Sequence, residues 1–203
     1  MGCGWTPNPP IDMHLVQAVE AVNGTDATRP DSGIPFWEKQ LAQGFRPTAV
    51  GGSDNHRAVP ILTEPDIPVG TPTTVVHAAE LSMPAVLDGI RAGHVFVDTE
   101  GTSDRMIDLE ASVGSSKAGM GDELKADSGS DITVQASMKA PAGSKLIVLL
   151  DGKPLANIVV AGATTTAHLA GDGKPHWLRA EARASDGRLL LLGNPVYLNR
   201  LQR

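Results

Sequence analysis

The hydrophobic pattern of the chain changes its period near residue 101, and this change constrains the fold more than any other feature. Before residue 101, short apolar runs alternate with stretches of helical spacing, which is typical of α/β architecture. After it, apolar and polar residues alternate over residues 132–138 and 178–184, a pattern that predicts strands with one face in water. The sequence therefore predicts an α/β part followed by a β part.

Two Asp-Gly pairs indicate tight turns in the second part. Asp151-Gly152 and Asp186-Gly187 each lie between two apolar runs. This dipeptide tolerates the positive φ angles that a two-residue hairpin turn requires. About seven strands separated by turns within roughly a hundred residues predict a small antiparallel β-sandwich over residues 105–203.

The first part, residues 1–104, carries the capping signals of two helices. Ser32 and Ser82 begin the two predicted helices, and Gly44 and Gly93 suit the left-handed conformation that ends a helix. Strands are expected at residues 18–22, 48–51, 73–78 and 95–97. This alternation of strands and helices predicts a sheet with helices packed on it.

Composition argues against several classes of function. The formal net charge is −6 and the Lys and Arg residues are scattered, so the chain lacks the basic footprint of a nucleic-acid-binding protein. No apolar run approaches the ~18 residues that cross a bilayer. Cys3, the single cysteine, has no second thiol for a disulfide or a Cys-x-x-Cys pair. The first residues lack the basic start and apolar core of a signal peptide, so we expect a soluble protein of undetermined compartment.

The sharpest local feature is the run Gly-Gly-Ser-Asp-Asn-His at residues 51–56, which follows a predicted strand. Alternate side chains of an extended segment share a face, so Asp54 and His56 can both turn toward one metal ion. Both residue types bind zinc and manganese. A glycine-rich loop with an Asx-type hydrogen bond is the alternative, and it is the commoner origin of such a pattern.

Five short segments resemble, in order and spacing, the second half of metal-dependent hydrolases of the polymerase and histidinol phosphatase (PHP) type, CehA/McbA-like group. They are Val-Glu-Ala-Val-Asn-Gly at residues 19–24, Trp37 with Leu41 and Gly44, the run at residues 51–56, Gly-Thr-Pro-Thr-Thr-Val-Val at residues 70–76, and the helix-to-strand segment at residues 85–97. The similarity covers about the first hundred residues, and the following sandwich resembles, more loosely, an accessory domain.

The resemblance implies that residues 1–104 are the C-terminal part of a PHP distorted β/α barrel. It also implies that Asp54 and His56 are ligands in a cluster of divalent zinc, manganese or iron ions. The activity implied is hydrolysis of a small-molecule ester or phosphoester through a metal-activated water. Glu20 and Asn23 match a strand end beside the metal centre, where they would contact the ligands or the substrate; a polar strand end without such a role is an equal alternative.

The family's pattern is present only in part. PHP domains take further ligands from His-x-His and Asn-His-Pro motifs, and this sequence contains neither. His14 lies in no ligand motif and is expected on the surface of a short helix. We therefore expect this chain to be part of a longer hydrolase and inactive alone, with its incomplete barrel covered, for instance in a homo-oligomer. A non-catalytic module that binds a ligand or a protein through the sandwich is the competing interpretation.

Overall fold

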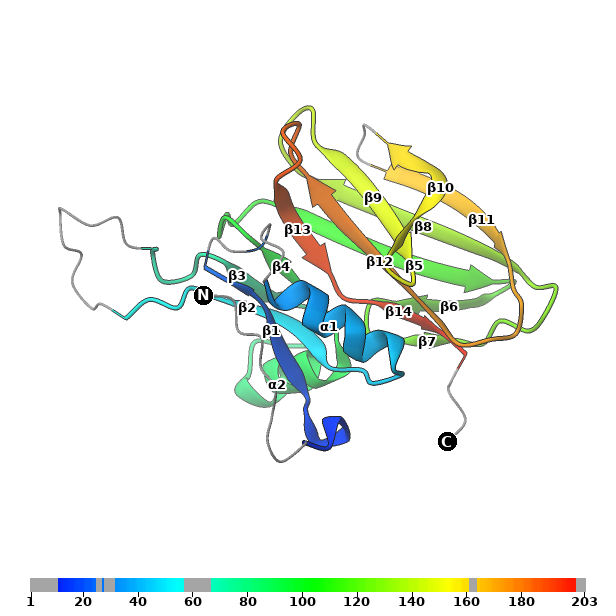
Figure 1. Cartoon of the computed structure of the whole chain (residues 1–203), viewed down its shortest axis with the longest axis horizontal. Helices are drawn as coiled ribbons and strands as arrows, with labels where there is room; N and C mark the ends of the chain where they lie inside the picture. Colours follow the sequence, from blue (N-terminus) through cyan, green and yellow to red (C-terminus); the bar gives the residue numbers. More distant parts are fainter. Residues whose placement is uncertain (1–10, 25–26, 28–31, 57–66, 161–163, 200–203) are drawn as a thin grey trace.

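The computed structural model describes residues 11–24, 27, 32–56, 67–160 and 164–199 (Figure 1). The helices are α1 (Gly33–Ala42) and α2 (Met83–Ala92), and η1 (Met13–Leu15) is a short 3-10 turn. The first strands are β1 (Ala18–Asn23), β2 (Thr48–Gly52), β3 (Thr73–Val76) and β4 (Val95–Asp98). They are followed by β5 (Met106–Val113), β6 (Ser116–Gly119), β7 (Glu123–Leu124), β8 (Asp131–Lys139), β9 (Lys145–Leu150), β10 (Lys153–Val160), β11 (Thr164–Ala170), β12 (His176–Arg183), β13 (Leu189–Gly193) and β14 (Val196–Leu198).

The local signals in the sequence correspond to the ends of the observed elements. The Ser82 hydroxyl accepts a backbone N–H at 3.3 Å, and Gly93 ends α2 with a φ of 80°. Ser32 precedes α1 but makes no side-chain hydrogen bond to it. Asp151 and Gly152, with φ angles of 49° and 77°, join β9 to β10 in the mirror-turn conformation expected of this dipeptide. Within the described ranges, no helix has the length and apolarity needed to cross a bilayer.

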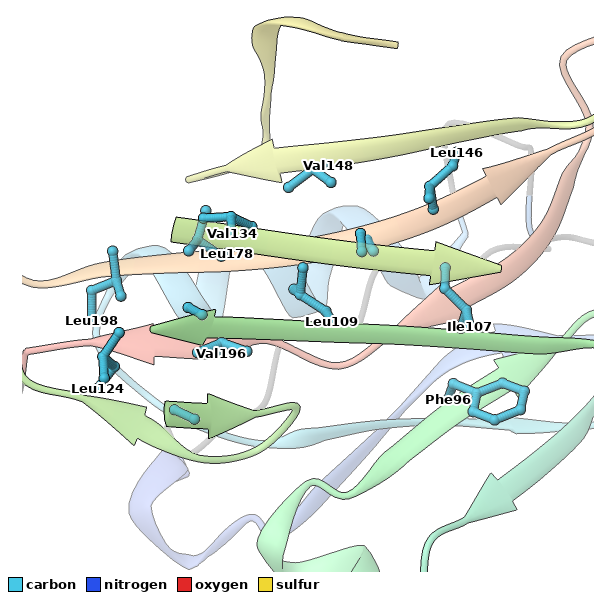
Figure 2. Packing of buried hydrophobic residues seen from close by; sticks show 14 of the residues in the cluster. Phe96, Ile107, Leu109, Leu124, Val134, Leu146, Val148, Leu178, Val196 and Leu198 are labelled. Carbon is cyan, nitrogen blue, oxygen red and sulfur yellow. The ribbon is translucent and has the colours of Figure 1, made fainter. Parts of the chain in front are cut away.

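Two sheets face each other across the main core. The larger sheet has the strand order β10-β9-β12-β13-β4-β3, with β14 paired to β12 and β7 paired to β14, and the smaller has the order β11-β8-β5-β6. Figure 2 shows the apolar side chains packed between the sheets, among them Leu109, Val134 and Leu178, all buried. The fold is thus mixed α/β and dominated by strands, in agreement with the predicted combination of an α/β part and a sandwich.

The larger sheet contains strands from both sides of residue 104. β4 pairs with β13 in antiparallel fashion, and β3 pairs with β4 in turn. β1 pairs with β2 in parallel, as β7 does with β14, whereas the other described ladders are antiparallel. The described residues do not form a closed barrel, so the PHP origin of this part remains a prediction.

The second face of β12 is not in water at Arg179 and Glu181, which corrects the expectation of one wet face for residues 178–184. Arg179 and Glu181 are only 3% and 4% exposed, because α1 covers this face (Figure 1). Glu38 of α1 accepts hydrogen bonds from Arg179 Nε at 3.0 Å and Nη2 at 2.6 Å, and Glu181 accepts one from Arg179 Nη1 at 2.7 Å. Burial raises the pKa of Glu181, but the charges of Arg179 and Arg183 outweigh burial and hold it below its ordinary value.

A side chain, rather than a backbone ladder, joins β2 to the larger sheet. Asn194, which is 1% exposed, accepts from the Ala49 N–H at 2.8 Å and donates to the carbonyl oxygens of Ala49 at 3.0 Å and Val95 at 2.9 Å. The Thr74 hydroxyl accepts from the Gly51 N–H at 2.9 Å and donates to the Gly51 carbonyl oxygen at 2.8 Å. The backbone N–H and C=O groups of Ala49 and Gly51 thereby find hydrogen-bond partners on β3 and at the end of β13.

Replacing Asn194 therefore tests how β2 is held. We expect Asn194→Ala to lower the free energy of unfolding by about 2 to 5 kcal/mol, because the Ala49 N–H and C=O would stay buried without partners. Urea unfolding measures this change, and Gln43→Ala, at an exposed position after α1, is the control that should stay within about 0.5 kcal/mol. A loss below about 1 kcal/mol for Asn194→Ala would show that packing alone holds β2.

His176 joins two turns at the start of β12. Its Nδ1 lies 2.6 Å from Asp151 Oδ2, and its Nε2 lies 3.1 Å from Asp172 Oδ1. Carboxylates only accept hydrogen bonds, so both contacts are made when the ring carries both protons. Burial lowers the pKa of His176, but the two carboxylates outweigh burial and raise the pKa above 6.5. The folded state therefore favours the imidazolium form.

This arrangement predicts a pH dependence of stability. The His176 contribution should be complete below the unfolded-state pKa of about 6.5 and should be lost as the pH rises through the higher folded-state pKa. Urea midpoints measured from about pH 5 to about pH 9 should therefore fall more steeply with pH for the wild type than for His176→Gln. Equal slopes for the two proteins would contradict the expected stabilisation by the two carboxylate contacts of His176.

Candidate functional site

The parallel pairing of β1 with β2 brings the carboxyl ends of both strands to one edge. Glu20 lies opposite Val50 in the register, and Asn23 lies opposite Gly52. The Gly24 N–H continues the pairing by donating to the Gly52 carbonyl oxygen at 2.8 Å. Side chains that leave neighbouring parallel strands at this end gather outside the sheet. We call the surface formed by Glu20, Asn23 and residues 53–56 the β1–β2 edge.

Asp54 and His56, the predicted metal ligands, contact each other on the β1–β2 edge. Asp54 Oδ1 lies 2.8 Å from His56 Nε2, and the two side chains are 56% and 82% exposed. Both residues lie beyond the last residue of β2, so the loop that follows the strand, rather than the alternation of an extended segment, brings them together. Asp54 has a φ of 51°, in the left-handed region that Asp adopts more readily than most residues.

Glu20 and Asn23 form a second pair on the same edge. Asn23 Nδ2 donates to Glu20 Oε2 at 3.1 Å. The other carboxylate oxygen, Oε1, lies over Gly52, so closely that a Cβ at this position would be 2.5 Å from it. Gly52 thus gives the Glu20 carboxylate room to lie across the end of β2.

The two pairs do not merge into one cluster of ligands. In the parts of the chain that the structure describes, no three His, Cys, Asp or Glu side chains come close enough together to hold a metal ion. His14 is exposed in η1, as expected. His94 lies at the corner between α2 and β4, where its Nε2 is 3.0 Å from Asp122 Oδ1.

Ser53 and Asn55 shape the β1–β2 edge, a role that was not predicted from the sequence. The Ser53 hydroxyl accepts the Asn55 backbone N–H at 3.3 Å. Asn55 Nδ2 donates to the Ile67 carbonyl oxygen at 2.6 Å, which ties the loop after β2 to the chain that precedes β3. Their residue types could have indicated this role, because Ser and Asn side chains commonly hydrogen-bond to nearby backbone in turns and loops.

Comparison with known proteins does not assign the chain to a family. No family model matches the chain, and a search of curated proteins gives no match. The PHP resemblance therefore remains a prediction that depends on the five sequence segments.

The two glycines of β2 provide a matched test of this geometry. We expect Gly52→Ala to change the free energy of unfolding by less than about 1 kcal/mol, because the exposed Glu20 side chain can move away from the new methyl group. Gly51→Ala should cost about 1 to 3 kcal/mol, because its methyl group would lie 2.7 Å from Val97 Cγ1 and 3.0 Å from Pro72 Cγ. Urea unfolding of both variants measures the difference, and the reverse order would contradict it.

Proposed function

We propose that Asp54 and His56 hold a divalent metal ion in a hydrolase of the PHP type that acts on phosphoesters or related esters. The observation that supports the proposal best is the 2.8 Å separation between Asp54 Oδ1 and His56 Nε2 on exposed side chains. Their place beyond the carboxyl ends of two parallel strands is where α/β proteins commonly bind ligands. The resemblance of the surrounding segments to PHP hydrolases supplies the reaction class.

The chemistry and spacing of the two donors fit one coordination shell. Carboxylate oxygen and imidazole nitrogen bind zinc, and imidazole also suits iron while carboxylate suits manganese. With bonds of about 2.1 Å, neighbouring donors in an octahedral or tetrahedral shell lie about 3.0 to 3.4 Å apart. The 2.8 Å separation of Asp54 Oδ1 and His56 Nε2 is close to this range, so a small rotation of two exposed side chains would suffice.

A divalent ion bound here would supply Lewis acidity toward an ester or phosphoester. Glu20 adds a second carboxylate to the β1–β2 edge, and Asn23 holds its Oε2 through the 3.1 Å hydrogen bond. The position of Glu20 Oε1, over Gly52, suits a contact with a metal ligand or with the substrate. In this proposal, Glu20 and Asn23 are positioning residues and Asp54 and His56 are ligands.

With only Asp54 and His56 as protein ligands, we expect the metal ion to bind weakly. Structural zinc sites with four ligands are worth ~10 to 16 kcal/mol, so two ligands that keep half of this supply ~5 to 8 kcal/mol. The corresponding dissociation constants run from roughly 0.1 mM to micromolar. Because both side chains are largely exposed, we expect the weaker end of this range.

Zinc titration of the chain tests the proposal. We expect isothermal titration to give a dissociation constant near 0.1 mM for zinc, and the variant with Asp54→Ala and His56→Ala to lose this binding. The control carries Asp131→Ala and His168→Ala, which remove another exposed Asp-His pair, 3.5 Å apart, on the smaller sheet. Binding of zinc should survive in this control.

Two results would decide against the metal site. Zinc binding that persists in the Asp54 and His56 variant would place the ion elsewhere, and the absence of saturable binding by the wild type would remove the basis of the proposal. Phosphoesterase activity with added zinc or manganese, lost in the same variant, would extend the support from metal binding to hydrolysis.

A further inference from the structure

A cavity of about 410 Å³ lies between the end of α1 and the start of β12. Its apolar walls are formed mainly by Leu41, Phe45, Trp177 and Tyr197. The volume falls within the range of about 300 to 1,000 Å³ that is usual for small-molecule sites. No residue of the β1–β2 edge lines this cavity, so it is separate from the proposed metal site.

The charged groups that line the cavity are predominantly positive. Arg46, Lys174 and His176 face a single carboxylate, that of Asp151. Both oxygens of Asp151 are already engaged, because Oδ2 accepts from His176 Nδ1 at 2.6 Å and Oδ1 accepts from the Trp177 backbone N–H at 3.0 Å. His176 is thus paired within the lining, and Arg46 is paired with Glu123 outside it, so Lys174 is the cation of the lining that forms no ion pair with a described residue.

Arg46 and Lys174 are the cations that remain able to meet a ligand. The Arg46 guanidinium lies 4.3 Å from the centre of the Tyr197 ring, with Nη1 at 3.0 Å from Glu123 Oε2, and its side chain is 33% exposed. Burial raises the pKa of the Tyr197 phenol, so this ring stays neutral near pH 7. Lys174 is exposed, and its ammonium forms no ion pair with any residue that the structure describes.

We propose that this cavity binds a small carboxylate with an aromatic or similarly flat apolar body, whose carboxylate group is recognised by Lys174 and Arg46. Phe45 and Trp177 supply the apolar contact area for the body. An anionic ligand is favoured over a cationic one because the only carboxylate in the lining, that of Asp151, is already engaged, whereas the Lys174 ammonium forms no ion pair with any described residue.

His176 acts as a positioning residue in this site. Both of its ring nitrogens are occupied by Asp151 and Asp172, so neither is free to donate to a ligand. Its contact with Asp151 holds the β9–β10 turn against the start of β12, which fixes one wall of the cavity. We therefore expect Lys174 and Arg46 to make the direct charge contacts with the ligand.

The first measurement is a titration of the full chain with 3-phenylpropionate, followed by backbone amide shifts in ¹H–¹⁵N spectra. We expect saturable shifts at residues 44–46, 174, 176 and 177, none at residues 53–56, and a dissociation constant of about 1 mM or below. The neutral 3-phenylpropionamide, which keeps the body and removes the charge, should bind about tenfold more weakly.

A pair of lysine variants completes the test. Lys174→Gln should weaken 3-phenylpropionate binding about tenfold, because it removes a charge-assisted contact at an exposed position without disturbing the fold. Lys117→Gln, which removes a lysine paired with Glu110 on the smaller sheet, should leave binding unchanged. No saturable shift up to about 20 mM, equal affinity for the acid and the amide, or unchanged affinity in Lys174→Gln would each overturn the proposal.

Discussion

The carboxamide of Asn194 takes the place of a strand ladder between β2 and the larger sheet. It pairs with both backbone polar groups of Ala49 and with the Val95 carbonyl oxygen, at a position that water does not reach. Such a buried network is specific because every group in it must be satisfied at once. The candidate ligands follow directly from β2, so their position relative to the sandwich depends on this side chain and on the hydroxyl of Thr74.

Around β12, the larger sheet is buried on both faces, and the two faces are held by different physical means. Toward the smaller sheet, apolar side chains pack across the sandwich core (Figure 2). Toward α1, apolar packing is accompanied by the buried network of Arg179 with Glu38 and Glu181. Desolvation offsets much of the attraction in such a network, but an unmatched partner would be a buried charge without compensation. The network therefore restricts α1 to the placement in which Glu38 meets Arg179.

Features that depend on neighbours in sequence could be predicted, and features that depend on distant partners could not. The Asp-Gly turns and helix caps are local, and the contact of Asp54 with His56 joins residues only two apart. Alternation of side chains over residues 178–184 showed correctly which residues share a face. It could not show that α1 covers the face of Arg179 and Glu181. The role of Asn194 was equally hidden, because its partner Ala49 lies 145 residues earlier.

The separation of 145 residues between Ala49 and Asn194 has a consequence for the chain as it leaves the ribosome. At a synthesis rate of about 5 to 20 residues per second, roughly 7 to 30 s pass between the emergence of Ala49 and that of Asn194. During this interval β4 also lacks its neighbour β13. The N-terminal strands therefore complete their hydrogen bonding only after Asn194 has emerged, and until then the nascent chain presents them to chaperones and proteases as open edges.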